Sequence, residues 1–419
     1  MNINIKEVAT KVTMAKPDWT QDGQLLQVYR VPLEFLYYND DNGRIATWIS
    51  EHKSHHGENA LSEMTREEYN DLIHEFIKKS NTSTSFKNTY NDIHEKGQIR
   101  PGVVLKDGRV VSGNRRFTVL RELYKNTGND KYAFFECFIL DQSLDLEHER
   151  KEIKTIERMT QFGVDEKVDY DPIDRLVDVY NDLIGPRKIW SQKEYERKLG
   201  LTRSQVSTMY IKASIMADYL EYKDQPESFY IARNQKLDGP LQELVSIYKK
   251  TSKAEWNRIR PAFYSFFGKE GDTTRNVRDL KKTYNSNKTE FNTVLNSIID
   301  DIEKSEQALL EDLINPSVPI DASESTESVP NSVIPDNRVV PPILSKETER
   351  IFVKAVTKTK TENIRQKKVE NVIQSLEKVY QGAEDALKTA NKNEKARLFN
   401  RLKLAKQTID KLLSEQNES

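Results

Sequence analysis

The sequence predicts an α+β amino-terminal domain, then an all-α domain with a helix-turn-helix, and finally a carboxyl-terminal helical segment, either a coiled coil or a hairpin. Three observations lead to this prediction. Two short β-branched runs lead into a glycine turn and a helix, two helix-start signatures lie close together, and a proline-rich stretch precedes a charged helical tail. The corresponding domain boundaries are 1–150, 151–313, 314–342 and 343–419.

Composition indicates an ordinary globular protein of two or three domains. Its 419 residues are 36% hydrophobic and 31% charged, and the formal net charge of −1 neither demands nor excludes a nucleic-acid partner. The single cysteine, Cys137, excludes an internal disulfide framework and favours a reducing compartment. Neither a signal peptide nor an apolar run of about 20 residues is found, so we expect a cytoplasmic protein without a membrane partner.

The stretch 97–123 predicts a β-hairpin that leads directly into a helix. Strands at 103–105 and 109–111 flank Asp107-Gly108, a pair that favours a tight type I′ turn because both central residues accept a positive φ. The second strand is followed by a glycine turn and then by an apolar pattern of helical period.

This glycine turn predicts an anion-binding site formed by four residues: Gly113, Asn114, Arg115 and Arg116. A strand that turns at glycine into a helix leaves backbone N–H groups unpaired at the positive end of the helix dipole. We expect Asn114 to cap the helix and the two arginines to bind phosphate oxygens. An ordinary strand–helix turn with two solvated arginines is the alternative.

The remaining elements of the first domain follow from periodicity and turn residues. We expect strands at 27–36 and 133–140, a helix at 85–96 that ends at Gly97, and a helical insertion at 45–84. Three polar residues in the turn after the first strand are either ligand contacts or plain turn residues: Asn39, Asn42 and Arg44. Three histidines of the insertion lack a recognised ligand spacing, so we predict a loop and no metal site there: His52, His55 and His56.

Residues 186–213 predict a helix-turn-helix, which we place at 191–213. Ser191 with Glu194 and Thr202 with Gln205 form two capping boxes, and Gly200 lies between them. Seven Lys and Arg residues stand against two Glu in 186–213, a local excess of five positive charges in a near-neutral protein. A generic helical hairpin is the alternative.

The second helix of this motif is expected to enter the major groove of double-stranded DNA. Its candidate base-reading residues are Arg203, Ser204, Gln205, Ser207 and Thr208. Lys212, further along the helix, is expected to contact phosphate.

The carboxyl-terminal third changes composition twice. Helical patterns continue to residue 313, and 315–342 has six prolines and no glycine, which predicts a disordered or extended linker. From 346 to 413 the sequence is charged and helical, with apolar residues three and four apart and a break at 391–393. A narrow apolar stripe of this kind needs a partner, and we expect self-association.

The order and spacing of about 40 residues resemble the amino-terminal domain of the ParB/sulfiredoxin superfamily. The resemblance covers Tyr90–Gly97, the strand start Gln98–Pro101, the hairpin and the glycine turn at 113–116. A looser second match consists of Glu157 and Gln161, which share a helix face within the acidic stretch 141–182, followed by Pro172-Ile-Asp174. A solvated charged face is the alternative for that stretch. Two positions depart from the superfamily pattern: Asn114 replaces a glutamate and Thr118 an arginine.

The resemblance implies a nucleoside triphosphate, CTP or ATP with Mg²⁺, bound at Gly113, Asn114, Arg115 and Arg116. Glu157 and Gln161 would then close over the phosphates or the metal. Members of the family that use CTP slide on DNA as a nucleotide-gated clamp. The resemblance thus implies a ParB-like, sequence-specific DNA-binding homodimer that is nucleoid-associated in a bacterium or phage, with a motor ATPase as partner if it serves plasmid or chromosome partition.

Two other classes of function stay open. One is a superfamily enzyme, either a metal-dependent nuclease or an NTP-using enzyme such as a slow CTPase; the sulfiredoxin reaction is disfavoured because Asn114 stands where it needs a cysteine. The other is a nucleotide-blind transcriptional regulator or adaptor in a plasmid, phage or defence cassette.

Overall fold

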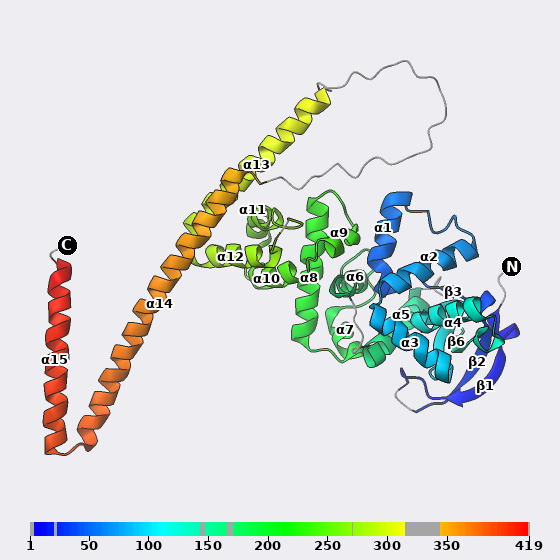
Figure 1. The fold of residues 1–419 in the computed structure, drawn as a ribbon, viewed down its shortest axis with the longest axis horizontal. Helices are drawn as coiled ribbons and strands as arrows, with labels where there is room; N and C mark the ends of the chain where they lie inside the picture. The colour runs from blue at the N-terminus through cyan, green and yellow to red at the C-terminus, as the bar shows by residue number, and fades with distance from the viewer. Residues whose placement is uncertain are drawn as a thin grey trace. The chain divides into compact units, whose positions relative to one another are not determined.

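The computed structural model describes residues 4–20, 23–142, 147–165, 171–269, 271–314 and 344–417 (Figure 1). The chain divides into two units, 1–281 with 295–345 and 282–294 with 346–419. The expected linker falls almost wholly on residues 315–342, which lie outside the described part.

Six strands and fifteen α-helices are found in the described part of the chain. The strands are β1 (Thr10–Ala15), β2 (Leu26–Pro32), β3 (Tyr37–Tyr38), β4 (Gly102–Leu105), β5 (Arg109–Ser112) and β6 (Phe134–Leu140). The first helices are α1 (Ala46–His56), α2 (Arg66–Lys79), α3 (Ser83–Lys96), α4 (Asn114–Thr127), α5 (Glu147–Asp165), α6 (Pro172–Leu183) and α7 (Gln192–Leu199). The later helices are α8 (Arg203–Tyr222), α9 (Phe229–Asn234), α10 (Asp238–Tyr248), α11 (Lys253–Tyr264), α12 (Thr273–Ser286), α13 (Lys288–Ile314), α14 (Lys346–Thr389) and α15 (Lys392–Asn417).

The strands form one mixed sheet in the order β1-β2-β6-β4-β5-β3. β4 runs parallel to β6 and β3 runs parallel to β5, whereas the other neighbours are antiparallel. A mixed sheet followed by a helical majority confirms the expected α+β amino-terminal region and helical carboxyl-terminal region.

Helices cover both faces of the central strands, which is why β4 is buried along its whole length. On one face, Val104 packs in a core with residues of α2, α3 and α4, among them Phe117. On the other face, Val103 and Leu105 pack against Ile153 of α5. The alternation of neighbouring residues between the two cores is the period-2 pattern of a strand.

The hairpin is present, but the prediction of a type I′ turn is wrong. Among the described residues only Gly108 of the Asp107-Gly108 pair has a positive φ, 94°, whereas a type I′ turn needs two. Asp107 is held by its side chain, which accepts hydrogen bonds from the Arg109 N–H at 2.9 Å and the Tyr37 hydroxyl at 2.6 Å. The Gly108 N–H donates to the carbonyl of Leu105 at 2.9 Å, so three residues form the loop.

The expected helix before the hairpin is confirmed as α3, and Gly97 caps it with a φ of 76°. The insertion is also helical, but one prediction within it is wrong. His52, His55 and His56 lie in α1 and not in a loop, and the rings of His52 and His56 stack with centroids 4.3 Å apart.

The helical region that follows the sheet is built around α8. This helix contacts α6, α7 and α10, and its buried residues, such as Ile215, Tyr219 and Leu220, therefore point in several directions. Tyr219 packs edge-on against Phe267, with ring centroids 4.9 Å apart. None of the helices in the described ranges is both long enough and apolar enough to span a bilayer.

Candidate functional site

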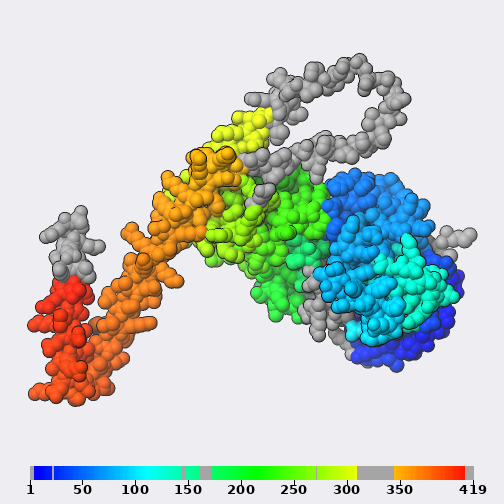
Figure 2. All heavy atoms as spheres, in the orientation of Figure 1, coloured from blue at the N-terminus to red at the C-terminus, as the bar shows by residue number. Residues whose placement is uncertain are grey.

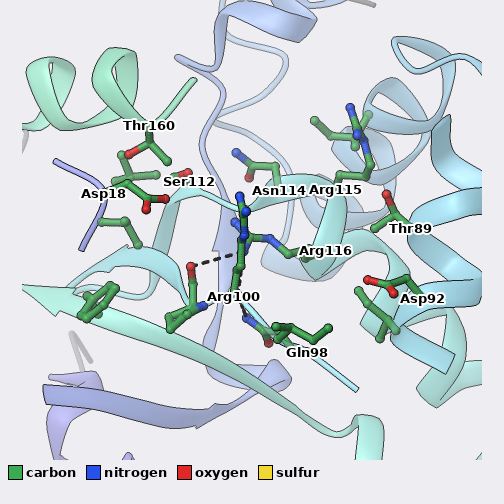
Figure 3. Close-up of a pocket in the computed structure, with 18 of the residues that line it drawn as sticks. Asp18, Thr89, Asp92, Gln98, Arg100, Ser112, Asn114, Arg115, Arg116 and Thr160 are labelled. Atoms are coloured by element: carbon green, nitrogen blue, oxygen red, sulfur yellow. Dashed lines mark hydrogen bonds between the residues drawn. The ribbon is translucent and has the colours of Figure 1, made fainter. Parts of the chain in front are cut away.

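A cavity of about 910 Å³ opens at the point where β5 turns into α4 (Figure 3). Its wall is formed by the glycine turn, the end of α3, the 97–101 segment before β4 and residues of two segments that precede α1. All four residues predicted for the anion site line it: Gly113, Asn114, Arg115 and Arg116.

Gly113 is required at this turn by both its backbone angle and its surroundings. Its φ is 96°, in the left-handed region that favours glycine. A Cβ atom here would lie 3.0 Å from the ring of Phe135 and 3.3 Å from the Cα of Gly102. Gly113 is the N-cap residue of α4, and the first N–H groups of that helix have no partner within it. The turn thus presents backbone donors to the cavity.

The two arginines are held in place by neighbouring polar groups. One Nη of Arg116 donates to the carbonyl of Arg100 at 2.6 Å and to that of Pro101 at 3.3 Å. The Nε of Arg115 donates to Oδ1 of Asn81 at 2.5 Å. In Figure 3, Arg116 extends across the middle of the cavity, with Ser112 and Thr160 on one side. A guanidinium fixed in this way presents its fork of donors with little entropy left to lose on binding.

The 97–101 segment is fixed by Gln98, whose side chain imitates a strand backbone. Its Nε2 donates to the carbonyl of Glu136 at 2.7 Å, and its Oε1 accepts from the Glu136 N–H at 2.9 Å. A side-chain amide offers a donor and an acceptor at this spacing without needing to be protonated. This pairing holds Arg100 at the cavity wall.

Positive charge dominates the cavity. Five cationic side chains line it against two carboxylates: Lys16, Arg44, Arg100, Arg115 and Arg116 against Asp18 and Asp92. An electropositive recess of this kind attracts anions before any contact is made. Sequence reasoning missed Lys16 and Arg100. Arg100 could have been found because it lies in the strand start Gln98–Pro101 that carries the family resemblance, whereas no local signal identifies Lys16.

Asn114 lines the cavity in a way that differs from the prediction. It is the first residue of α4 and makes no side-chain cap, so the capping prediction is wrong. The residue is 8% exposed, and within the described part of the chain its Oδ1 atom is buried without a hydrogen-bond partner. A buried amide oxygen normally finds a donor, so this atom is suited to a donor supplied by a ligand.

Of the polar turn residues before the insertion, Asn42 and Arg44 line the cavity and Asn39 does not. Asn42 accepts a hydrogen bond from the Arg44 N–H at 3.1 Å, which shapes the turn. Asn39 is buried, and its side chain accepts from the N–H of Asp41 at 3.2 Å. Asn39 therefore serves the structure of the turn, whereas Asn42 and Arg44 face the cavity.

Glu157 lies away from the cavity, contrary to its predicted place over the phosphates. It is fully buried in α5, its carboxylate lies 3.1 Å from the ammonium of Lys154, and burial raises its pKa. Thr160, one turn further along α5, lines the cavity. The side chain of Gln161 lies outside the described part of the structure.

The α7–α8 pair begins as the sequence predicts, with both capping boxes formed. Ser191 and Glu194 cap α7, and Thr202 and Gln205 cap α8. Gly200 ends α7 with a φ of 65°. The Oε1 atom of Gln205 accepts from the Thr202 N–H at 2.8 Å, so its Nε2 amide is the part that can face outward.

The candidate base-reading residues are accessible, but Lys212 is not. Arg203, Ser204 and Gln205 are exposed, and Ser207 and Thr208 are half-buried. Lys212 is 8% exposed and forms an ion pair with Asp238 at the start of α10. Its expected place on the phosphate-facing surface is therefore wrong, because tertiary packing brings α10 against this face of α8.

Comparisons with known proteins give a likeness among solved structures. No protein-family model matches the chain, and no curated protein matches it. Among solved structures, it is similar to one described as the C2221 form of a Pnob8-like ParB-N domain. That match has 14% sequence identity and a TM-score of 0.37, and it covers 65% of this chain and 97% of the other.

Proposed function

We propose that the chain is a ParB-like DNA-binding protein whose DNA binding is gated by a nucleoside triphosphate, CTP or ATP with Mg²⁺. The observation that carries this proposal is the cavity at Gly113, where backbone donors of α4 and five cationic side chains converge. Paired arginines at a helix N-terminus suit the oxygens of a phosphate group.

The cavity fits a nucleotide better than a free phosphate. Its volume of about 910 Å³ lies in the range of cofactor-sized sites. Arg115 and Arg116 would hold the phosphates, and Asn114 would accept a hydrogen bond from a ligand hydroxyl or amino group. The Mg²⁺ ion would supply charge neutralisation, with the phosphate oxygens as its main ligands.

DNA would be read by the α7–α8 pair as a helix-turn-helix. Its support is the exposed start of α8 at Arg203, Ser204 and Gln205, together with the local excess of positive charge in 186–213. Lys212 does not belong to this surface, since it is paired with Asp238.

A path of contacts supports gating between the two sites. The 42–47 turn lines the cavity through Asn42 and Arg44, and the Thr47 N–H donates to Asp174 of α6 at 3.1 Å. α6 in turn packs along α8. A ligand that moves this turn would shift α6 and thereby the start of α8, so the two sites would bias one conformational equilibrium. Self-association through α14 and α15 would bring two such reading helices onto one DNA site.

Isothermal titration with CTP and with ATP, each with and without Mg²⁺, tests the nucleotide part. We expect heat with one of them and at least a tenfold weaker affinity for Arg116→Ala. Lys125→Ala is the matched control, because Lys125 is exposed on the same helix and does not line the cavity. Absence of heat with both nucleotides, also after addition of DNA, would refute this part.

Selection of bound sequences from random double-stranded DNA tests the DNA part. We expect one enriched sequence whose binding is weakened about tenfold in Arg203→Ala and kept in Lys250→Ala, an exposed lysine after α10. If nothing is enriched and Arg203→Ala binds as the unaltered chain does, sequence-specific recognition through α8 is refuted.

A further inference from the structure

Asp18 is a carboxylate without a partner in a cavity that is rich in positive charge. It lines the cavity together with Asp92, against five cationic side chains. Asp92 forms an ion pair with Lys96 at 2.6 Å. Asp18 is exposed, and its side chain makes no hydrogen bond or ion pair with any of the described residues. An unpaired carboxylate disfavours the binding of an anion in this cavity, unless the anion brings a cation with it.

The turn that carries Asp18 is anchored on both sides of this residue. It follows β1, the outermost strand of the sheet (Figures 1 and 2). The N–H and the hydroxyl of Thr20 both donate to the carbonyl of Pro17, at 3.4 Å and 3.1 Å. Pro17 is buried, and Trp19 packs edge-on against Phe138 with ring centroids 5.3 Å apart. The two neighbours of Asp18 are therefore fixed, while Asp18 itself lines the cavity.

Two hydroxyl groups lie on the same side of Arg116 as Asp18 (Figure 3). Ser112 is the last residue of β5, and its side chain has no hydrogen-bond partner among the described residues. The Thr160 hydroxyl donates its hydrogen to the carbonyl of Ile156 at 2.8 Å, so the lone pairs of its oxygen stay available. Three segments that are far apart in the sequence thus bring a carboxylate and two hydroxyl oxygens to one side of the cavity.

This set of oxygen atoms suits a Mg²⁺ ion that is bound together with phosphates. Mg²⁺ keeps several of its waters and is usually held by one or two carboxylates and the phosphates of a substrate. The set lies beside the phosphate-binding turn, since Ser112 directly precedes Gly113. Neither of the carboxylates that the family resemblance places near the phosphates is available here. One position is occupied by Asn114, and at the other Glu157 is buried beside Lys154.

We propose that Asp18 is the carboxylate ligand of the Mg²⁺ ion that accompanies the nucleotide, with the hydroxyl oxygens of Ser112 and Thr160 beside it. Without metal, the Asp18 carboxylate repels the phosphates that the arginines hold. With Mg²⁺ between them, the same carboxylate attracts the complex, so the cavity prefers the metal-bound nucleotide over the free one. This inference rests on the nucleotide binding in the proposed function and names the residue that makes this binding depend on metal.

Isothermal titration with CTP and with ATP, in Mg²⁺ and in EDTA, tests this role on the full chain. We expect the nucleotide that binds to bind about tenfold more tightly in Mg²⁺ than in EDTA. Asp18→Asn should bring the two affinities together, because its affinity in Mg²⁺ falls while its affinity in EDTA stays or rises. Thr160→Val should reduce the difference less, since a water can replace a hydroxyl ligand. Asp18 is exposed, so the Asn variant should melt as the unaltered chain does.

Asp92→Asn is the matched comparison, because Asp92 is the other carboxylate of the cavity and lies on the opposite side of Arg116 (Figure 3). Whatever this change does to affinity, the ratio between Mg²⁺ and EDTA should stay that of the unaltered chain. Equal affinities in Mg²⁺ and EDTA for the unaltered chain would overturn the inference and leave the nucleotide site in place. The same holds if Asp18→Asn keeps the ratio or loses affinity equally in both conditions. Absence of heat in every condition would overturn the nucleotide site and this inference together.

Discussion

The backbone of Gly43 lies directly against the carboxylate of Asp178. A Cβ atom at residue 43 would come within 1.9 Å of Oδ1 and 2.2 Å of Oδ2 of that carboxylate. Asp178 cannot easily move aside, because Arg158 donates to it at 2.7 Å and to Asp182 at 2.9 Å, all inside the protein. The turn that carries Asn42 and Arg44 into the cavity therefore packs directly against α6.

Gly43→Ala is expected to destabilise the protein by about 1–3 kcal/mol, because the added methyl group forces apart a close-packed turn and a buried ion pair. The variant should also bind nucleotide more weakly, since Arg44 would shift. Urea unfolding measures the first effect and titration the second. Gly382→Ala, which meets open space in α14, is the control. An unchanged unfolding midpoint for Gly43→Ala would contradict the close packing of this turn against α6.

Two substitutions of Asn114 test whether its side-chain oxygen contacts a ligand. Asn114→Ala removes a buried, unpartnered acceptor, so the ligand-free protein should become more stable by about 1 kcal/mol while nucleotide binding weakens severalfold. Asn114→Asp adds a negative charge beside Arg115 and Arg116 and should weaken nucleotide binding more than tenfold. Thermal unfolding with and without nucleotide reads both effects; equal affinities for the two variants would argue against a ligand contact at this atom.

Asp174 is expected to make stability fall as pH rises. Burial raises its pKa to about 8 from 3.8, although the Thr47 N–H donates to it. Between these two values the folded protein holds a proton that the unfolded chain has released, so the stabilisation is complete below about pH 3.8 and is lost as pH approaches 8.

Asp174→Asn keeps an acceptor for Thr47 and removes the titration, so its melting temperature should fall less between pH 5.5 and pH 8.5 than that of the unaltered chain, by roughly a few degrees. Some decline should persist, since burial also raises the pKa of Glu157 and Asp182. Parallel melting curves for the two proteins would contradict a neutral Asp174.

Two basic residues of α8 are expected to behave differently when removed. Arg203→Ala should lower DNA affinity by about tenfold and leave the melting temperature unchanged, because Arg203 is exposed at the start of the helix. Lys212→Met should lower stability by about 1–3 kcal/mol and leave the DNA affinity of the folded protein unchanged, because Lys212 is paired with Asp238. A fluorescence-polarisation titration measures DNA affinity and a melting curve measures stability for each variant. If Lys212→Met lost DNA binding but kept full stability, the result would support the predicted contact between Lys212 and phosphate.

Features specified by neighbouring residues were predictable from the sequence. The capping boxes at Ser191 and Thr202 formed because each needs only a hydroxyl and a carboxylate or amide three residues later. The glycine turn at Gly113 formed for a similarly local reason, since a strand must reverse into a helix there. The a/d spacing of α14 is likewise a property of the linear chain.

Features that depend on distant neighbours were not predictable in this way. The Asp107-Gly108 pair favours a type I′ turn, but the observed hairpin turn is different. Its conformation depends on the side chain of Asp107, which accepts a hydrogen bond from Tyr37 of another strand. Glu157 was expected at the ligand because its helix resembles the second superfamily motif, whereas packing buried it beside Lys154.

The sequence by itself determined which helices begin with a capping box, which turn carries the paired arginines and which helices carry an apolar stripe, because these depend on interactions within a few residues. Only the tertiary structure decided that Lys16, Arg44 and Arg100 join Arg115 and Arg116 around one cavity and that Lys212 turns inward to Asp238. Burial and charge pairing join residues far apart in the chain, so they are fixed only when the elements pack together.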